Sequence, residues 1–580
     1  MILQALIGYY DRRARSASSD IPPFGFSREK IRYALVLSPD GHLVQVKDLR
    51  ANIEGRIAPK EMVVPQATKR AVNIEPNFCW DNTGYVLGKD NKDKDDRAKE
   101  AFQSFRELHQ LIGRSLNDAG YHALLEFLGS WEPDKTTEVI DCLGSEGARW
   151  EDVAGQNVVF QIDGEMMYIH EKEEVRNAWV QYWWEKKSGI AAECLVTHEY
   201  GDVERLHPAI KGVYGGHTAG SDLISFNLAA FESYGKEQSF NAPLSRRAAF
   251  SYTTALNDLL RFGSRNRVVI ADTSVVFWTE RDSPVEGFLG MIFDPADDSA
   301  DDAQLRLFLE SIRDGKMPEQ YQSDGDVRFY VLGLSPNAKR LAVRFWHVTT
   351  VEKLFKCVGQ HFYDFRIISQ YENSPECPGL WRLLVQTAVQ EDSKNIVPHL
   401  ATGVMHSILT GGPYPVNLLS AVLGRIRANG DINYFRAGLI KAYLVRRARL
   451  FNQPTLEVGM ALDRQSVNVA YRLGRLFAVL ERAQQDAVPG ANATIKDRYY
   501  SAASVTPRTV FPQLLRLTQH HIGKSDYGAV REREIAEIMD AVQEFPAHLP
   551  LEEQGLFAVG YYHQRQSFYT KTQETKEVAS

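Results

Sequence analysis

Strand-forming patterns stop near residue 380, and this change of character limits the folds that the chain can adopt. Before that point, apolar runs rich in β-branched residues and separated by turn residues predict strands. These runs are Arg32–Leu37, Leu43–Val46, Tyr85–Leu87, Val158–Ile162, Met166–Ile169, Arg267–Trp278, Phe329–Leu334 and Leu341–Phe345. Amphipathic helices interrupt them at Asp95–Gly113, Val175–Lys187 and Arg246–Phe262, and the charged stretch Asp294–Asp302 predicts an exposed loop. Because the alternation has no βαβ period and no repeat, it indicates an irregular α+β region.

The remainder of the chain predicts helices alone. Apolar residues recur there at helical spacing, and Gly or Pro stands in several of the short loops, as in an antiparallel bundle. The helical segments are Leu380–Val389, Ile396–Thr410, Val416–Ala428, Asn433–Phe451, Ser466–Gln484, Val510–His521, Val530–Gln543 and Gln554–Tyr569. The predicted fold class is therefore α+β: a large irregular N-terminal α+β region followed by an all-α C-terminal helical bundle.

A chain of 580 residues is too long for a single core. We predict an N-terminal α+β region over residues 1–376, linking helices over 380–453 and a C-terminal helical bundle over 460–580. The first boundary falls at Glu376–Gly379 and the second at Asn452–Pro454, where a proline follows a polar pair.

Composition narrows the function. The net charge of -7 argues against a protein that coats phosphate indiscriminately, so a nucleic-acid role must depend on local basic faces. The five cysteines are far apart and none forms a CxxC pair, which favours reduced thiols in a cytoplasmic protein over disulfides or a zinc ribbon. No stretch approaches the roughly 18 apolar residues of a membrane span.

No catalytic constellation stands out in the sequence. His521–Ser525 resembles the end of a phosphate-binding loop, but Thr518 occupies the position of the opening glycine. The adjacent His520 and His521 would point about 100° apart on a helix, which suits a metal site poorly. We therefore expect a binding protein without catalytic residues, metal or cofactor.

The segment Pro59–Gly88 combines a basic pair with amides and aromatic rings. Lysine and arginine can hold phosphate, asparagine can donate to and accept from base edges, and an aromatic ring can wedge against a base step. The candidate DNA-binding residues are Lys69, Arg70, Asn73, Asn77, Phe78, Trp80 and Asn82. The alternative is that the asparagines form turns and the aromatic rings belong to the core.

The segment His207–Leu260 is dense in Gly, Ser and Asn, so its backbone could approach a ligand closely. Its candidate contacts with a nucleic acid or a neighbouring subunit are Lys211, Asn241, Arg246 and Arg247. A turn-rich, packed interior would explain the same composition.

The helix Ser466–Gln484 carries an apolar stripe and, on another side, a basic strip. The stripe is formed by Val469, Leu473, Leu476, Phe477 and Leu480. The strip comprises Arg464, Asn468, Arg472, Arg475 and Arg482 and could follow a phosphate backbone. A solvated helix face is the alternative.

The helix Asn433–Phe451 has several cations and no acid. Arg436 and Arg447 project into its apolar stripe, and a buried arginine requires a carboxylate or phosphate partner. We therefore predict that this helix lies at an interface with a nucleic acid or another subunit.

Taken together, these segments resemble one family: the large subunit of the type I-C CRISPR Cascade complex, the c-subtype of the Cas-eight proteins, also called Csd-one. The matching stretches are MILQALIGYY, EPNFCWDNTGYVLG, SFNLAAFESYGKEQSFNAPLS, DTSVVFW and MALDRQSVNVAYRLGRLFAVLE, from Met1 to about Glu481. Glu75 departs from this pattern, because a lysine before Pro76 would suit a DNA-facing loop better.

The resemblance implies a non-catalytic subunit that recognises the protospacer-adjacent motif in double-stranded DNA, promotes duplex opening, holds the displaced strand and presents the complex to a helicase–nuclease. Base pairing with the guide would then select the target. The implied partners are the CRISPR guide RNA, target DNA, the backbone and guide-processing subunits and the helicase–nuclease, with no membrane. The family's motif-recognising loop corresponds to Lys69–Asn82, so Lys69, Asn73 and Asn77 are carried over as candidates.

The resemblance also implies a small subunit made by internal translation of the same gene. Met460 heads the last matching stretch, so we expect a second product that starts there and joins the complex in extra copies. Two other functions stay open at this point: a metal-dependent nuclease whose carboxylates assemble across the fold, and a pure assembly scaffold.

Overall fold

The computed structural model describes residues 1–53, 55–70, 73–91, 95–144, 149–186, 189–293, 311, 319–369, 374–490 and 492–577. The chain forms two compact units. Unit 1 comprises Met1–Ser264 and Pro336–Ala342, and unit 2 comprises Arg265–Ser335 and Val343–Ser580. The predicted loop Asp294–Asp302 lies outside the described residues.

A four-stranded mixed sheet is the centre of unit 1. Its order is β3 (Leu43–Asp48), β2 (Tyr33–Leu37), β8 (Asn157–Ile162) and β7 (Trp80–Asn82). The hairpin of β2 and β3 is confirmed, and β2 pairs with β8 in parallel. The predicted strand Met166–Ile169 is reduced to one bridge, Gln161 to Tyr168, and the predicted strand at Tyr85 is wrong, because Asn82 caps a short helix, α2 (Thr83–Val86).

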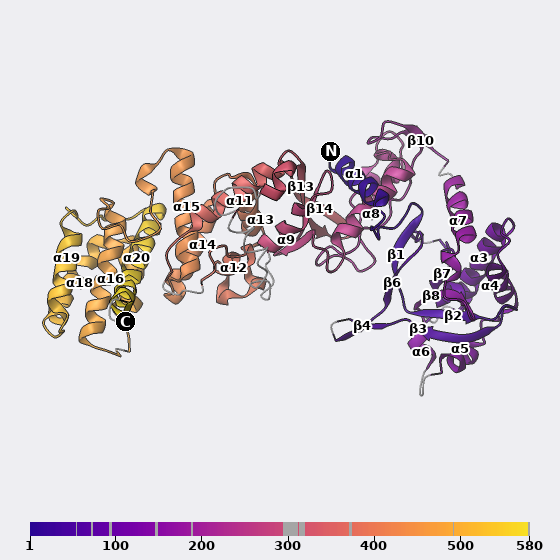
Figure 1. Ribbon diagram of the computed structural model, residues 1–580, viewed down its shortest axis with the longest axis horizontal. Helices are drawn as coiled ribbons and strands as arrows, with labels where there is room; N and C mark the ends of the chain where they lie inside the picture. Colours follow the sequence, from indigo (N-terminus) through magenta and orange to yellow (C-terminus); the bar gives the residue numbers. More distant parts are fainter. Residues whose placement is uncertain are drawn as a thin grey trace. The chain divides into compact units, whose positions relative to one another are not determined.

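Helices cover this sheet and enclose an aromatic core. The predicted helices at 95 and 175 are confirmed as α3 (Asp95–Gly113) and α7 (Glu173–Glu185), and α4 (Ala119–Ser130) packs on β8 (Figure 1). Phe78, Phe105 and Phe127 are fully buried in this core together with strand residues such as Phe160.

A second part of unit 1 is built on an antiparallel ribbon and two helices. The ribbon pairs β1 (Phe26–Ile31) with β6 (Lys60–Pro65). Helix α1 (Ile2–Arg15) packs against α8 (Arg246–Leu260), the third predicted helix, where Tyr10 meets Phe250 edge to face at 5.5 Å.

Unit 2 begins with an antiparallel sheet in the order β11 (Arg267–Ile270), β12 (Thr273–Thr279), β13 (Arg328–Asn337) and β14 (Arg340–Thr350). The sequence predicted one strand across Arg267–Trp278. The structure divides it into β11 and β12, because Ala271 adopts a φ of 54° and the chain turns back on itself there.

Helices make up the rest of unit 2, as predicted. They are α11 (Val351–Phe365), α12 (Leu380–Val385), α13 (Pro398–Thr410), α14 (Val416–Asn429), α15 (Tyr434–Phe451), α16 (Val469–Ala487), α17 (Ile495–Val505), α18 (Pro507–Ile522), α19 (Gly528–Met539) and α20 (Leu551–Glu577). Helix α11 begins 29 residues before the predicted start of the helical region at Leu380. Gly411 and Gly430 end their helices in the left-handed conformation that favours glycine.

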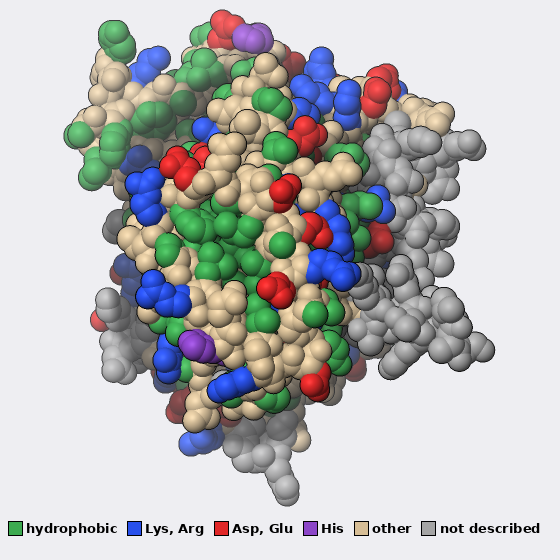
Figure 2. Space-filling model, turned by 90° about the vertical axis from the view of Figure 1, so that its left-hand side faces the viewer, with side chains coloured by type: hydrophobic (Ala, Val, Ile, Leu, Met, Phe, Trp, Pro, Cys, Tyr) green, Lys and Arg blue, Asp and Glu red, His purple; other side chains and the backbone are tan. Residues whose placement is uncertain are grey.

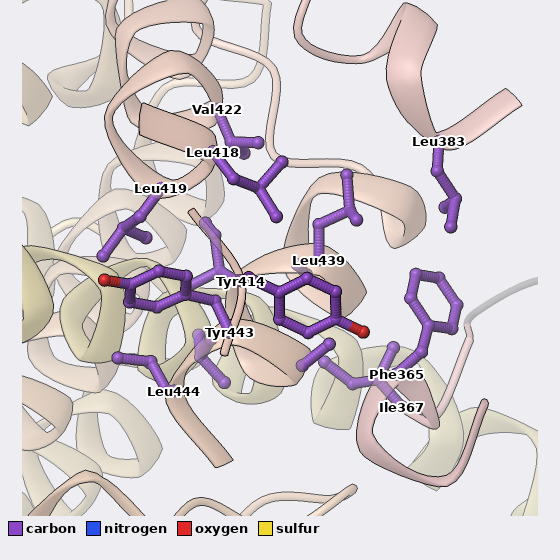
Figure 3. Packing of buried hydrophobic residues seen from close by; sticks show 14 of the residues in the cluster. Phe365, Ile367, Leu383, Tyr414, Leu418, Leu419, Val422, Leu439, Tyr443 and Leu444 are labelled. Atoms are coloured by element: carbon purple, nitrogen blue, oxygen red, sulfur yellow. The ribbon is translucent and has the colours of Figure 1, made fainter. Parts of the chain in front are cut away.

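One continuous core runs through unit 2. Its buried residues extend from Val268 in the sheet to Tyr562 in α20. Figure 3 shows Leu418 and Leu419 of α14 packed toward Tyr443 and Leu444 of α15 in this core. The structure therefore differs from the predicted boundaries at residues 376 and 453, because side chains on both sides of each boundary are buried together.

Candidate nucleic-acid interface

The loop between β6 and β7 is closed at its base by two polar side chains. Asn77 is buried, and its Oδ1 accepts a hydrogen bond from the Thr68 backbone N–H at 2.8 Å. Arg70 Nε donates to the Glu75 carbonyl oxygen at 2.6 Å. These two bonds join the two arms of the loop, Thr68 to Asn77 and Arg70 to Glu75.

An ion pair with a buried carboxylate anchors Arg70. Its guanidinium makes two hydrogen bonds to the Asp81 carboxylate and lies over the Tyr85 ring, 3.8 Å from the centroid. Asp81 is 1% exposed and also accepts the backbone N–H groups of Asn77 and Asn82. Asp81 was not among the predicted site residues. The one signal for it in the sequence is that an acid stands eleven residues after Arg70, within the short strand β7.

Lys69 is engaged on the opposite side of the loop. Its Nζ donates to Asp222 Oδ1 at 2.6 Å and to the His207 carbonyl oxygen at 3.1 Å. Burial, reinforced by the charge of Lys69, lowers the pKa of His207 to about 4, so this histidine is neutral beside the lysine. Lys69 therefore ties the loop to the segment His207–Leu260 and is half-buried.

Four of the predicted DNA contacts are structural residues. Phe78 is fully buried and stacks on Trp179 with ring centroids 5.3 Å apart. Trp80 is buried with its Nε1 donating to the Pro65 carbonyl oxygen at 2.8 Å, and Asn82 caps α2. The prediction that these side chains and Asn77 contact bases is corrected, because packing and capping already engage them.

Asn73 is the candidate that meets the requirement of a base contact. It is exposed and lies between Arg70 and Glu75, which a hydrogen bond joins. An exposed amide between such residues can present a donor and an acceptor to base edges in one geometry.

The basic strip of α16 is largely an internal structure. Arg472 is buried, and its Nη1 donates to the carbonyl oxygens of Glu537 and Ile538 at 3.2 and 3.0 Å. Arg475 is 2% exposed and donates to Gln564, to Glu537 and to two carbonyl oxygens of the preceding loop. The predicted track for a phosphate backbone is therefore wrong at these two arginines, since α19 and α20 cover them.

The remaining members of the strip are also engaged. Asn468 caps α16 by accepting the Tyr471 N–H at 3.0 Å. Arg464 pairs with Glu537 at 3.5 Å, and Arg482 pairs with Asp486 at 2.9 Å; both guanidinium groups are partly exposed. Figure 2 shows the side on which α18 and α19 lie in Figure 1, where Lys and Arg side chains are interspersed with acids around an area of hydrophobic side chains.

The candidates in the segment His207–Leu260 form ion pairs within unit 1. Lys211 donates to both oxygens of Glu29, at 2.8 and 2.6 Å. Arg246 pairs with Asp202 and Glu204, each at 3.1 Å. Arg247 is exposed and lies 3.5 Å from Asp11, and the Asn241 amide is bonded within its own loop.

The basic helix α15 has partners that the sequence did not show. Arg436 is fully buried and pairs with Glu391 at 3.0 Å, while Arg447 lies 3.5 Å from Glu552. Asp364 of α11 is fully buried and accepts hydrogen bonds from Arg446 and Arg449 at 2.8 Å. The expectation that a buried arginine needs an anionic partner is confirmed for Arg436, but the partner belongs to the same chain, so an interface is not required.

Two features are absent from the described part of the chain. Within it, no three His, Cys, Asp or Glu side chains are grouped so that they could hold a metal ion. Among the helices described there, none combines the length and the apolar character needed to cross a membrane.

Comparison with known families identifies the class of protein. Residues 6–569 match the family model described as CRISPR-associated protein (Cas_Csd1), so the chain belongs to this family of CRISPR-associated proteins. The match supports the large subunit of the type I-C Cascade complex, and membership implies association with other Cascade components. No curated protein matches the chain significantly.

Proposed function

We propose that this subunit recognises the protospacer-adjacent motif in double-stranded DNA, promotes opening of the duplex, holds the displaced strand and presents the complex to a helicase–nuclease. It acts in the cytoplasm with guide RNA and does not itself cut DNA. The observation that carries the proposal is the exposure of Asn73 between Arg70 and Asn77, two residues whose side chains bond across this part of the chain. Family membership supplies the setting for this loop.

Fixing the flanking residues before binding favours recognition. Flanking residues that are held in advance lose little conformational entropy when they meet DNA, so more of the contact energy appears as affinity. The Arg70–Asp81 pair joins a half-buried guanidinium to a buried carboxylate, and the Lys69–Asp222 pair is half-buried, so solvent screens both less than it screens an exposed pair. Acids of the chain already engage both cations, so the amide of Asn73 carries the sequence-specific contact.

Substitution of Asn73 by Ala tests the proposal. We expect affinity for target duplex carrying the motif to fall by about 1–3 kcal/mol, with unchanged thermal stability and unchanged guide-RNA assembly. Asn52→Ala is the matched control, because Asn52 is an exposed asparagine elsewhere in unit 1. If Asn73→Ala binds that duplex as well as Asn52→Ala does, the loop does not recognise the motif.

The same preparation distinguishes the two other functions. A scaffold without DNA contacts should show no salt-dependent binding to DNA. A chain that neutralises phosphates should lose DNA affinity steeply as the salt concentration rises. Cleavage of duplex by the purified chain with Mg²⁺ or Mn²⁺ would establish a nuclease and contradict the non-catalytic role.

A further inference from the structure

A pocket of about 410 Å³ opens in unit 1 between helix α7 and the chain that leads into β1. Its walls are Pro23, Phe24 and Phe26 on one side and Glu171, Glu173, Arg176, Asn177 and Val180 on the other. Pockets of roughly 300–1,000 Å³ that combine apolar walls with a few polar groups are typical of small-molecule sites. None of these residues belongs to the loop with Asn73, so the pocket is not part of the candidate DNA contact.

Side chains of α7 hold the aromatic wall of the pocket in place. Trp179 Nε1 donates to the Gly25 carbonyl oxygen at 2.6 Å, and the Phe24 ring packs edge to face on Trp183 with centroids 4.7 Å apart. Gly25 has a φ of 84°, which favours glycine, and Phe24 and Phe26 on either side of it both line the pocket. A ligand therefore meets a wall that is already ordered, and little binding energy is lost in ordering it.

Helix α7 supplies polar groups in a fixed order along one face. Glu173, Arg176 and Val180 are spaced by three and four residues, so their side chains are neighbours in a row on the helix. Asn177 stands four residues after Glu173 and belongs to the same row. The row therefore runs from a carboxylate through a guanidinium and an amide to an apolar side chain.

The charged groups of the pocket have opposite signs. Glu171 Oε2 accepts the Tyr168 N–H at 3.0 Å, which fixes one carboxylate at the wall. The Arg176 guanidinium lies over the Phe26 ring, 5.1 Å from the centroid, and forms no ion pair with a carboxylate of the described residues. Two carboxylates disfavour a polyanion, and the guanidinium disfavours a simple cation. A ligand that carries both charges matches this lining.

We infer that this pocket binds an apolar α-amino acid, either free or as the first residue of a polypeptide. Glu171 and Glu173 receive the ammonium group. Arg176 and Asn177 donate to the carboxylate or carbonyl oxygen, while the aromatic wall covers the apolar side chain. The inference goes beyond the proposed function and does not depend on it.

Calorimetric titration of the purified full chain with four probes tests this assignment. L-phenylalanine carries both charges, its amide and the tripeptide Phe-Gly-Gly keep the ammonium group beside a carbonyl oxygen, and N-acetyl-L-phenylalanine lacks the ammonium group. N-acetyl-L-phenylalanine should bind about 10-fold or more weakly than L-phenylalanine or the amide, because it leaves two carboxylates without a cation. Tighter binding of L-phenylalanine than of the amide and the tripeptide identifies a free amino acid, and the reverse order identifies a chain end.

Variants of α7 show whether the bound probe occupies this pocket. Glu173→Gln and Arg176→Gln should each weaken the tightest probe by about 10-fold or more, with an unchanged melting temperature, because both side chains are exposed. Glu174→Gln is the matched control, since Glu174 is the adjacent exposed acid and does not line the pocket.

Three results would each overturn the inference. The first is that neither L-phenylalanine, its amide nor the tripeptide binds the wild-type chain at millimolar concentration. The second is that N-acetyl-L-phenylalanine binds as tightly as they do. The third is that Glu173→Gln and Arg176→Gln weaken binding no more than Glu174→Gln does.

Discussion

Arg475 connects three parts of unit 2 through one side chain. It bonds to the loop before α16, to Glu537 of α19 and to Gln564 of α20. Arg475→Ala would leave these acceptors without their donor in a buried place, so we expect the free energy of unfolding to fall by about 3 kcal/mol. The loss of the helical circular dichroism signal on heating or in urea measures this change in the free energy of unfolding.

Arg482 provides the control for this prediction. It lies on the same helix, but its side chain is partly exposed and its ion pair with Asp486 is of the i,i+4 type. Arg482→Ala should cost less than about 1 kcal/mol. If both variants lost the same free energy of unfolding, burial would not explain how much each arginine contributes to stability.

His109 predicts a pH dependence of stability. It is fully buried, its Nε2 accepts the Cys79 N–H at 2.9 Å, and burial lowers its pKa from 6.5 to about 4. The folded state therefore keeps the ring neutral, while the unfolded chain binds a proton below pH 6.5. The contribution of His109 to the free energy of unfolding is therefore fully present above pH 6.5. It falls by about 3 kcal/mol as the pH drops toward 4.

The variant His109→Gln isolates this contribution, because glutamine can keep polar contacts without titrating. His170 and His207 are also buried with pKa values lowered to about 4, so wild type and variant will both lose stability in acid. We expect the melting temperature of wild type to fall more steeply between pH 7 and 4.5. Parallel curves would exclude His109 as a source of the slope.

Helices α16 and α20 approach so closely that only glycine fits between them. A Cβ atom at Gly474 would overlap the Phe557 carbonyl oxygen, and one at Gly560 would overlap the Tyr471 carbonyl oxygen. Gly474→Ala must therefore separate the two helices, and we expect a loss of about 3 kcal/mol or more in urea unfolding. Gly424→Ala in α14 is the control: no atom lies within 4 Å of the added Cβ, so it should stabilise by about 0.5–1 kcal/mol.

Helix α16 shows how far the sequence can predict a site. Periodicity correctly predicts that Leu473, Leu476 and Leu480 are buried. It assumes, however, that a helix has one covered face, and α16 is covered by α18, α19 and α20. The face with Arg472 and Arg475 becomes buried through helices more than 50 residues away, which local spacing cannot reveal.

At the level of the molecule, the fold class and the family were predictable, because long patterns and long matching stretches depend little on tertiary detail. The division into units was not, because the core of unit 2 joins a sheet to helices far along the chain. The sequence correctly indicated that the loop with the candidate DNA contacts is polar. Only the folded structure shows that Phe78 and Trp80 point inward while Asn73 stays exposed.

Internal translation from Met460 remains a prediction, and the structure sharpens it. Met460 is partly exposed, so Met460→Leu should not alter the fold, while it should remove a C-terminal product from the purified complex. Mass spectrometry detects that product, and a silent change in the upstream ribosome-binding site should remove it as well. Absence of the product from a wild-type preparation would contradict the prediction.

A product that starts at Met460 would lack α14 and α15. In the full chain, Leu419 and Ile440 of these helices cover α20 at Gly555. The short product would therefore expose apolar surface that the full chain buries, and we expect it to be less stable alone than the same residues within the full chain.

The sheet of unit 2 has a consequence for how the chain responds to a protease. Strands β11 and β12 precede the segment between Phe293 and Glu319, and β13 and β14 follow it, yet β12 and β13 pair over six residues from Ser274–Leu334 to Thr279–Phe329. A cut in that segment would give two fragments that each hold half of one sheet. They would migrate separately under denaturing conditions and elute together under native ones, so an intact elution profile would not prove an intact chain.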